Sequence, residues 1–88
     1  MTIVIDEGLL EYAIGKALEK YDPEQPQRCV NLFIFLMSQT DPETPPPLFF
    51  VYHERFSLEL ATAVLCGADE AEEALRHAGR LMIEGNLQ

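Results

Sequence analysis

Apolar residues recur at intervals of three and four over residues 6–21. They occupy positions 9, 10, 13, 14, 17, 18 and 21, which fall on one face of a helix with 3.6 residues per turn. Asp6 is a favourable N-cap residue for such a helix. Asp22-Pro23 is an expected end point, because the residue before a proline disfavours the α conformation. The pattern predicts one amphipathic helix over residues 6–21.

The next apolar segment, residues 28–39, has no clear periodicity. Its run from Leu32 to Met37 is continuously apolar, which is a feature of both buried strands and buried helices. Two observations favour a helix: Pro26 suits the first helical position, and a segment from 26 to 39 is long for a strand.

A proline-rich stretch, residues 40–47, separates this segment from LFFVYHERF at residues 48–56. Thr44 is a possible N-cap, and a proline just after it is tolerated because the first turn of a helix has no use for its missing N–H. The apolar residues that follow keep helical spacing, which favours a helix. The alternative is that residues 28–39 and 48–56 are strands that pair as a β-hairpin across the prolines.

Residues 69–84 form the clearest element in the sequence. Alanine, leucine and methionine fall on a narrow helical stripe, acidic residues open the segment, and Arg76 and Arg80 lie in its second half, an order that complements the helix dipole. Gly85 is a suitable residue to end the helix. Cys66-Gly67-Ala68 leaves room only for a tight turn, so residues 57–84 are expected to form a helical hairpin.

These segments together predict the fold class. We expect an all-α protein, a small bundle of about four helices with a C-terminal helical hairpin, folded as one domain over residues 1–88. The alternative fold is α+β, with a central β-hairpin at 28–39 and 48–56. A chain of 88 residues with 48% hydrophobic residues is too short for two domains but has enough apolar side chains for one core.

The charge of the chain narrows the classes of partner. Fifteen acids against six lysines and arginines give a net charge of −9, which disfavours direct binding to nucleic acid or to anionic lipid and favours basic partners. The apolar runs are much shorter than the roughly 20 residues of a membrane span. We therefore expect a soluble protein with no membrane association.

The sequence contains few residues or motifs that could support catalysis or bind a metal. Cys29 and Cys66 lack C-x-x-C spacing, so we expect two buried thiols in a reducing compartment and a cytoplasmic location. His53-Glu54 begins like the zinc motif H-E-x-x-H, but Ser57 stands where the second histidine would be. No nucleophile or phosphate-binding motif is present. We expect no enzyme activity, no catalytic residue, no metal and no cofactor.

The remaining candidates are surfaces for binding another protein. One is apolar and lies in the middle of the chain, and the other is acidic and lies at the start of the last helix. The candidate apolar residues are Phe49, Phe50, Tyr52 and Phe56. The candidate acidic residues are Asp69, Glu70, Glu72 and Glu73. The plainer interpretations are that the aromatic residues fill the core and that the acids are a solvated helix start.

The expected function is a non-enzymatic protein-binding module. An apolar site would suit an adaptor or a secretion-type chaperone that shields an apolar segment in a groove. The alternative is an acidic inhibitor or immunity-type protein, including a nucleic-acid mimic, that blocks a basic site on its partner. A homodimer is a further possibility, because a small domain with spare aromatic surface can bury it against a second copy.

Overall fold

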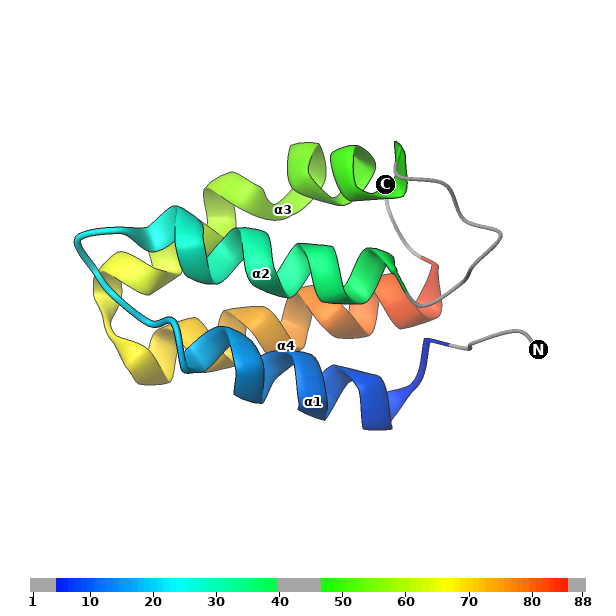
Figure 1. Ribbon diagram of the computed structural model, residues 1–88, viewed down its shortest axis with the longest axis horizontal. Coiled ribbons are helices and arrows are strands. Elements are labelled where there is room, and N and C mark those ends of the chain that lie inside the picture. The colour runs from blue at the N-terminus through cyan, green and yellow to red at the C-terminus, as the bar shows by residue number, and fades with distance from the viewer. Residues whose placement is uncertain (1–4, 40–46, 86–88) are drawn as a thin grey trace.

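The computed structural model describes residues 5–39 and 47–85, and within these ranges the chain forms helices and no strand. The helices, shown in Figure 1, are α1 (Glu7–Leu18), α2 (Pro26–Ser38), α3 (Pro47–Cys66) and α4 (Ala68–Glu84). The predicted helical bundle with a C-terminal hairpin is confirmed. The alternative β-hairpin is wrong, because both of its segments are helical. Each of these helices begins with a proline, Pro26 or Pro47, whose fixed φ suits the first helical position.

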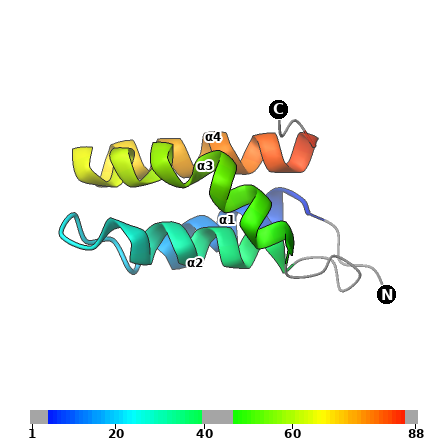
Figure 2. The same cartoon turned by 90° about the horizontal axis from the view of Figure 1, so that it is seen from above.

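The four helices form two layers. Figures 1 and 2 show α1 and α2 in one layer and α4 in the other, while α3 begins over α2 and ends beside α4. Each helix contacts the next along the chain, and α1 also contacts α4. Across the described residues α1 and α3 make no contact, so they lie at opposite corners of the bundle. The long helix α3 therefore has neighbours on its α2 and α4 sides, and its outer face is left uncovered.

Local hydrogen bonding explains where the helices begin and end. The side chain of Asp6 accepts a hydrogen bond of 2.9 Å from the backbone N–H of Leu9, as predicted for an N-cap. The helix ends at Leu18 rather than at Tyr21, because the next backbone bonds, such as Tyr21 N–H to Leu18 carbonyl, join residues three apart and tighten the chain into a turn. The proposed N-cap Thr44 lies outside the described residues.

A single residue connects α3 to α4. This residue, Gly67, has φ of 134°, in a region of backbone conformation that other residues rarely adopt. The predicted tight turn is confirmed, and so is the end of α4 at Gly85, which adopts the left-handed conformation. The short connection holds the C-terminal half of α3 against the N-terminal half of α4.

The core lies between the two layers and draws apolar side chains from every helix. Among the described residues, seventeen apolar residues are buried, and the bulkiest fully buried ones are Phe33, Phe56, Leu10, Ile34 and Met37. Burying a side chain of this size contributes about 1.5–3 kcal/mol. None of the described helices is both long enough and apolar enough to cross a membrane.

Candidate functional site

The outer face of α3 carries an apolar stripe. Val51, Leu58 and Leu65, which we call the α3 stripe, are 46%, 81% and 61% exposed. Their spacing of seven residues, almost two helical turns, places them in one line about 21 Å long. Phe50 lies beside the stripe and is 67% exposed. The exposed face of α3 also carries Glu54 and Arg55, which lie within one turn of the stripe residues.

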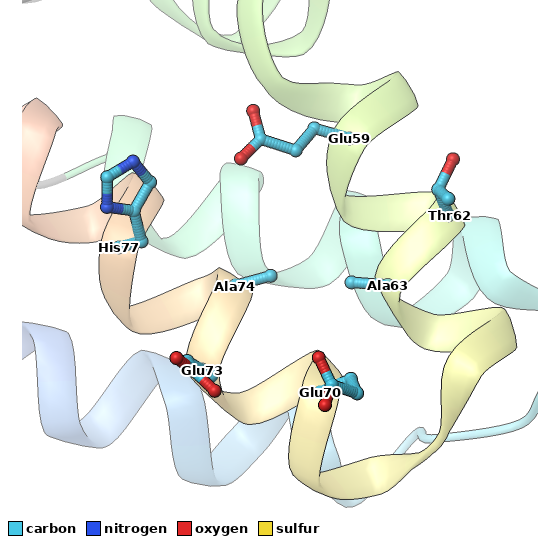
Figure 3. A pocket seen from close by; sticks show the side chains of 7 residues that line it. All are labelled: Glu59, Thr62, Ala63, Glu70, Glu73, Ala74 and His77. Carbon is cyan, nitrogen blue, oxygen red and sulfur yellow. The ribbon is translucent and has the colours of Figure 1, made fainter.

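A groove lies between the C-terminal half of α3 and the N-terminal half of α4. It is open to solvent, has a volume of about 430 Å³, and is lined by Glu59, Thr62, Ala63, Glu70, Glu73, Ala74 and His77. We call it the α3–α4 groove. Figure 3 shows Ala63 and Ala74 between the two helices, with the Glu59 side chain directed from α3 toward α4. The two alanines form a shallow floor, and carboxylates stand on both walls.

Two residues of the α3 stripe, Leu58 and Leu65, lie next to this groove. Thr62 lines the groove and lies within one helical turn of both Leu58 and Leu65. Its hydroxyl donates a hydrogen bond of 2.8 Å to the Leu58 carbonyl, so the side chain is held against its own helix. An apolar strip and an acidic groove therefore share one surface of the α3–α4 layer.

On the opposite side of α4, charged side chains form ion pairs with α1. Arg76 donates hydrogen bonds to both carboxylate oxygens of Glu11 and also lies 3.5 Å from Glu72. Arg80 forms an ion pair with Glu7. The hydrogen bond from Arg76 lowers the pKa of the Glu11 carboxyl below its usual range. The cations of α4 are thus paired with acids on its α1 side.

The carboxylates of the groove lack such partners. Within the described residues, Glu59, Glu70 and Glu73 have no ion pair. Arg55, one turn before Glu59 on α3, instead places its guanidinium 4.9 Å from the centre of the Phe56 ring. The groove therefore carries negative charge that the fold does not neutralise.

The predicted apolar site residues are divided between the surface and the core. Phe50 is exposed, and Phe49 is half-buried with its ring stacked 5.5 Å from His53. Tyr52 and Phe56 are buried against the other helices, so placing them on an exposed surface was wrong. They occupy the side of α3 that faces its neighbours. Val51, Leu58 and Leu65 were not predicted, although their seven-residue spacing was the available signal.

The predicted acidic residues are all exposed, but they do not form one site. Glu70 and Glu73 line the α3–α4 groove. Glu72 lies on the other side of α4, beside Arg76. Asp69 is in the first turn, where a negative charge stabilises the helix N-terminus. Glu59, which comes from α3 and completes the groove, was not predicted, because its position on a neighbouring helix has no local signal in the sequence.

The cysteines and histidines are dispersed. Cys29 is buried, and burial raises the pKa of its thiol above the usual value, which keeps it protonated and weakly nucleophilic. Cys66 is exposed at the end of α3, so the expectation of two buried thiols is wrong for this residue. Over residues 5–39 and 47–85, no group of three or more histidine, cysteine or acidic side chains is placed to hold a metal ion.

Comparison of the chain with models of known protein families, with curated proteins and with solved structures gives no match. The α3 stripe and the α3–α4 groove are therefore the basis on which a function can be inferred.

Proposed function

We propose that this protein is a non-enzymatic protein-binding module, an adaptor or secretion-type chaperone, that holds an apolar segment of its partner against α3. The observation that carries the proposal is the concentration of exposed apolar side chains on one helix. Six large apolar residues of the described chain are exposed, and four of them, Phe50, Val51, Leu58 and Leu65, belong to α3. Scattered single residues of this kind are ordinary on protein surfaces, whereas an aligned set is typical of an interface.

The arrangement also suits the energetics of recognition. Complete burial of one leucine or valine side chain contributes about 1.5–3 kcal/mol, so the stripe offers enough apolar surface to anchor a partner after the entropy of association is offset. The carboxylates of the groove provide the polar rim that surrounds the apolar centre of many interfaces.

A cytoplasmic location belongs to the same proposal. Its support is that both Cys29 and Cys66 are free thiols in the folded chain. Exposed free cysteines are compatible with a reducing compartment, whereas oxidising compartments favour disulfides.

The proposal can be tested by comparing two variants in a pull-down. The tagged chain and the variant Leu58→Gln plus Leu65→Gln are incubated with lysate of the source organism and washed at about 0.05 M and about 0.5 M salt. The control variant, Tyr12→Gln plus Phe35→Gln, removes two exposed apolar residues from other helices.

We expect a partner that the unaltered chain and the control retain through the high-salt wash and that the α3 variant does not retain. Equal retention by all three chains would refute the α3 stripe as the binding surface. Loss from both variants alike would also refute it, because binding would then depend on general surface hydrophobicity.

A second candidate function is an acidic inhibitor or immunity-type protein that blocks a basic site, including by mimicry of nucleic acid. The observation that favours it is the unpaired charge of Glu59, Glu70 and Glu73 along one groove. Binding carried by these carboxylates alone would be lost in the high-salt wash. It would also be insensitive to Leu58→Gln plus Leu65→Gln, which separates the two candidates.

A further inference from the structure

We infer that the partner segment is a cationic amphipathic helix that lies along the α3–α4 groove. Its apolar face would contact the α3 stripe, and its lysine or arginine side chains would face Glu59, Glu70 and Glu73. This inference rests on the protein-binding function proposed above and names the chemistry of the segment bound.

The shape of the surface suits a helix. The groove floor is made of Ala63 and Ala74, and small side chains allow another helix to approach closely. Leu58 and Leu65 of the stripe lie in the half of α3 that borders this groove and are about 10 Å apart along the helix, the rise of roughly 7 helical residues. A helix that repeats apolar residues every three or four positions keeps them on one side along that whole length.

The charges of the surface indicate the sign of the charge on the partner segment. Arg76 and Arg80 are paired with acids on the α1 side of α4. The groove side of the same helix carries Glu70, Glu73 and His77. Helix-dipole stabilisation accounts for Glu70 in the first turn of α4. It does not account for Glu73, beyond that turn, or for Glu59 in the middle of α3.

A second copy of this chain is a poorer occupant of the same surface. Each copy has a net charge of −9, and pairing the same face of two copies would bring their groove carboxylates together. Like charges at an interface oppose association. A cationic helix removes this repulsion and gives each carboxylate an opposite charge.

The test uses a synthetic peptide as the probe. The peptide has about 18 residues, an apolar face of leucines with one tryptophan, and a polar face of lysines, which makes it long enough to span the stripe. A second peptide carries glutamate in place of every lysine. The chain itself has no tryptophan, so tryptophan fluorescence comes from the peptide alone and reports its binding.

Matched charge variants locate the site. Glu59→Gln plus Glu73→Gln removes two carboxylates from the groove. Glu19→Gln plus Glu24→Gln removes two exposed carboxylates from the end of α1 and the loop that follows it, and it changes the net charge by the same amount. Leu58→Gln plus Leu65→Gln tests the apolar stripe. Sedimentation of the chain without peptide gives its mass and so shows whether it is a monomer or a dimer.

We expect the lysine peptide to bind the unaltered, monomeric chain and the glutamate peptide not to bind. The groove variant should weaken binding about tenfold, and the matched control should change it less than about twofold. Equal weakening by both charge variants would overturn the inference, because net charge alone would then be responsible. Failure of the lysine peptide to bind, or equal binding of the two peptides, would also overturn it.

The remaining outcomes separate this inference from the proposed function. If the stripe variant abolishes capture of the partner but the groove variant binds the peptide as tightly as the unaltered chain, the function stands and the cationic helix is wrong. A stable dimer that the stripe variant converts to a monomer would assign the surface to a second copy and overturn the inference.

Discussion

The two sides of α4 differ in what their small and charged side chains do. On the α1 side, Gly79 is buried against Leu10, and Arg76 is paired with Glu11. On the α3 side, in the first half of the helix, Ala74 and the carboxylate of Glu73 border an open groove. Both sides have small and charged residues, but only on the α1 side are the charges paired and the small residue buried by another helix.

This difference indicates how the contacts of the folded chain separate structural residues from candidate functional ones. A charge that is paired inside the molecule, such as Arg80 with Glu7, is explained by the contact it makes. A charge or apolar side chain that the fold leaves without a partner, such as Leu58 on α3, is the better candidate for recognition of another molecule.

The largest effect is expected from filling the close contact between α4 and α1. A Cβ atom at Gly79 would overlap Leu10 Cδ1 and lie 3.3 Å from Leu10 Cγ and Phe33 Cζ. Overpacking of this kind costs about 1–3 kcal/mol, so Gly79→Leu should lower the free energy of unfolding by about 3 kcal/mol. Chemical denaturation measures it, and an unchanged midpoint would show that α1 and α4 are not packed as described.

The same substitution on the groove side should be tolerated. Ala63→Leu extends a side chain into the open groove, so the free energy of unfolding should change by less than about 1 kcal/mol. Peptide binding, in contrast, should be blocked because the floor is filled. A loss of stability as large as that of Gly79→Leu would mean that the groove is closed in solution.

A glycine on the outer face of α1 gives the control for backbone effects. A Cβ atom at Gly15 would meet no atom within 4 Å, so Gly15→Ala should stabilise the protein by about 1 kcal/mol through helix propensity. Thermal unfolding of this variant and of Gly79→Leu should therefore shift in opposite directions. A destabilised Gly15→Ala would point to a contact on this face that the described residues do not make.

Two double substitutions of carboxylates should change the stability differently on the two sides of α4. These changes should be smaller than those above. Glu7→Gln plus Glu11→Gln removes the α1 partners of Arg80 and Arg76 and should lower the denaturation midpoint at pH 7. Glu59→Gln plus Glu73→Gln removes unpaired carboxylates and should leave the midpoint unchanged or raise it, because repulsion is reduced. Equal losses in the two variants would contradict the difference in pairing.

The smallest predicted effect is the pH dependence of the Glu11 contact. The hydrogen bond from Arg76 lowers the pKa of Glu11 in the folded protein from its ordinary value of 4.5. Its stabilising contribution is therefore complete at pH values above about 4.5 and is lost as the pH falls through the lower folded-state pKa. The stability difference between the unaltered chain and Glu11→Gln should shrink on acidification, and a difference that grew below pH 4.5 would contradict the assigned contact.

Much of the fold could be predicted from local patterns. The N-cap Asp6, Pro26 at the start of α2 and the glycine after α4 act on their own neighbours in the chain, so the sequence was enough to place them. The end of α1 was predicted three residues too late, at Tyr21 instead of Leu18, because the tighter backbone bonds at that point have no separate signature in apolar periodicity.

The site was harder to predict because burial on α3 depends on which helices pack against it. Tyr52 and Phe56 share the helical spacing that continues to Leu60, and Phe50 falls outside it. This periodicity separates buried from exposed residues only if residues 48–56 are helical, which the sequence left open against a strand. The groove could not be predicted from either helix alone, because Glu59 on α3 and Glu73 on α4 are brought to the same groove only by the hairpin. The negative sign of the charge could be predicted from composition. The ion pairs between α4 and α1, which leave the carboxylates on the groove side without cations, could not.

The most direct test of the central claim is to map the peptide on the folded chain by NMR. The lysine peptide is added to the labelled protein, and the change in each backbone amide shift is recorded. Binding to the outer surface of the hairpin predicts the largest changes at residues 58–65 of α3 and 70–77 of α4, with residues 7–16 of α1 unaffected. Changes centred on α1 or α2, or spread evenly over the molecule, would contradict a binding surface on α3 and α4.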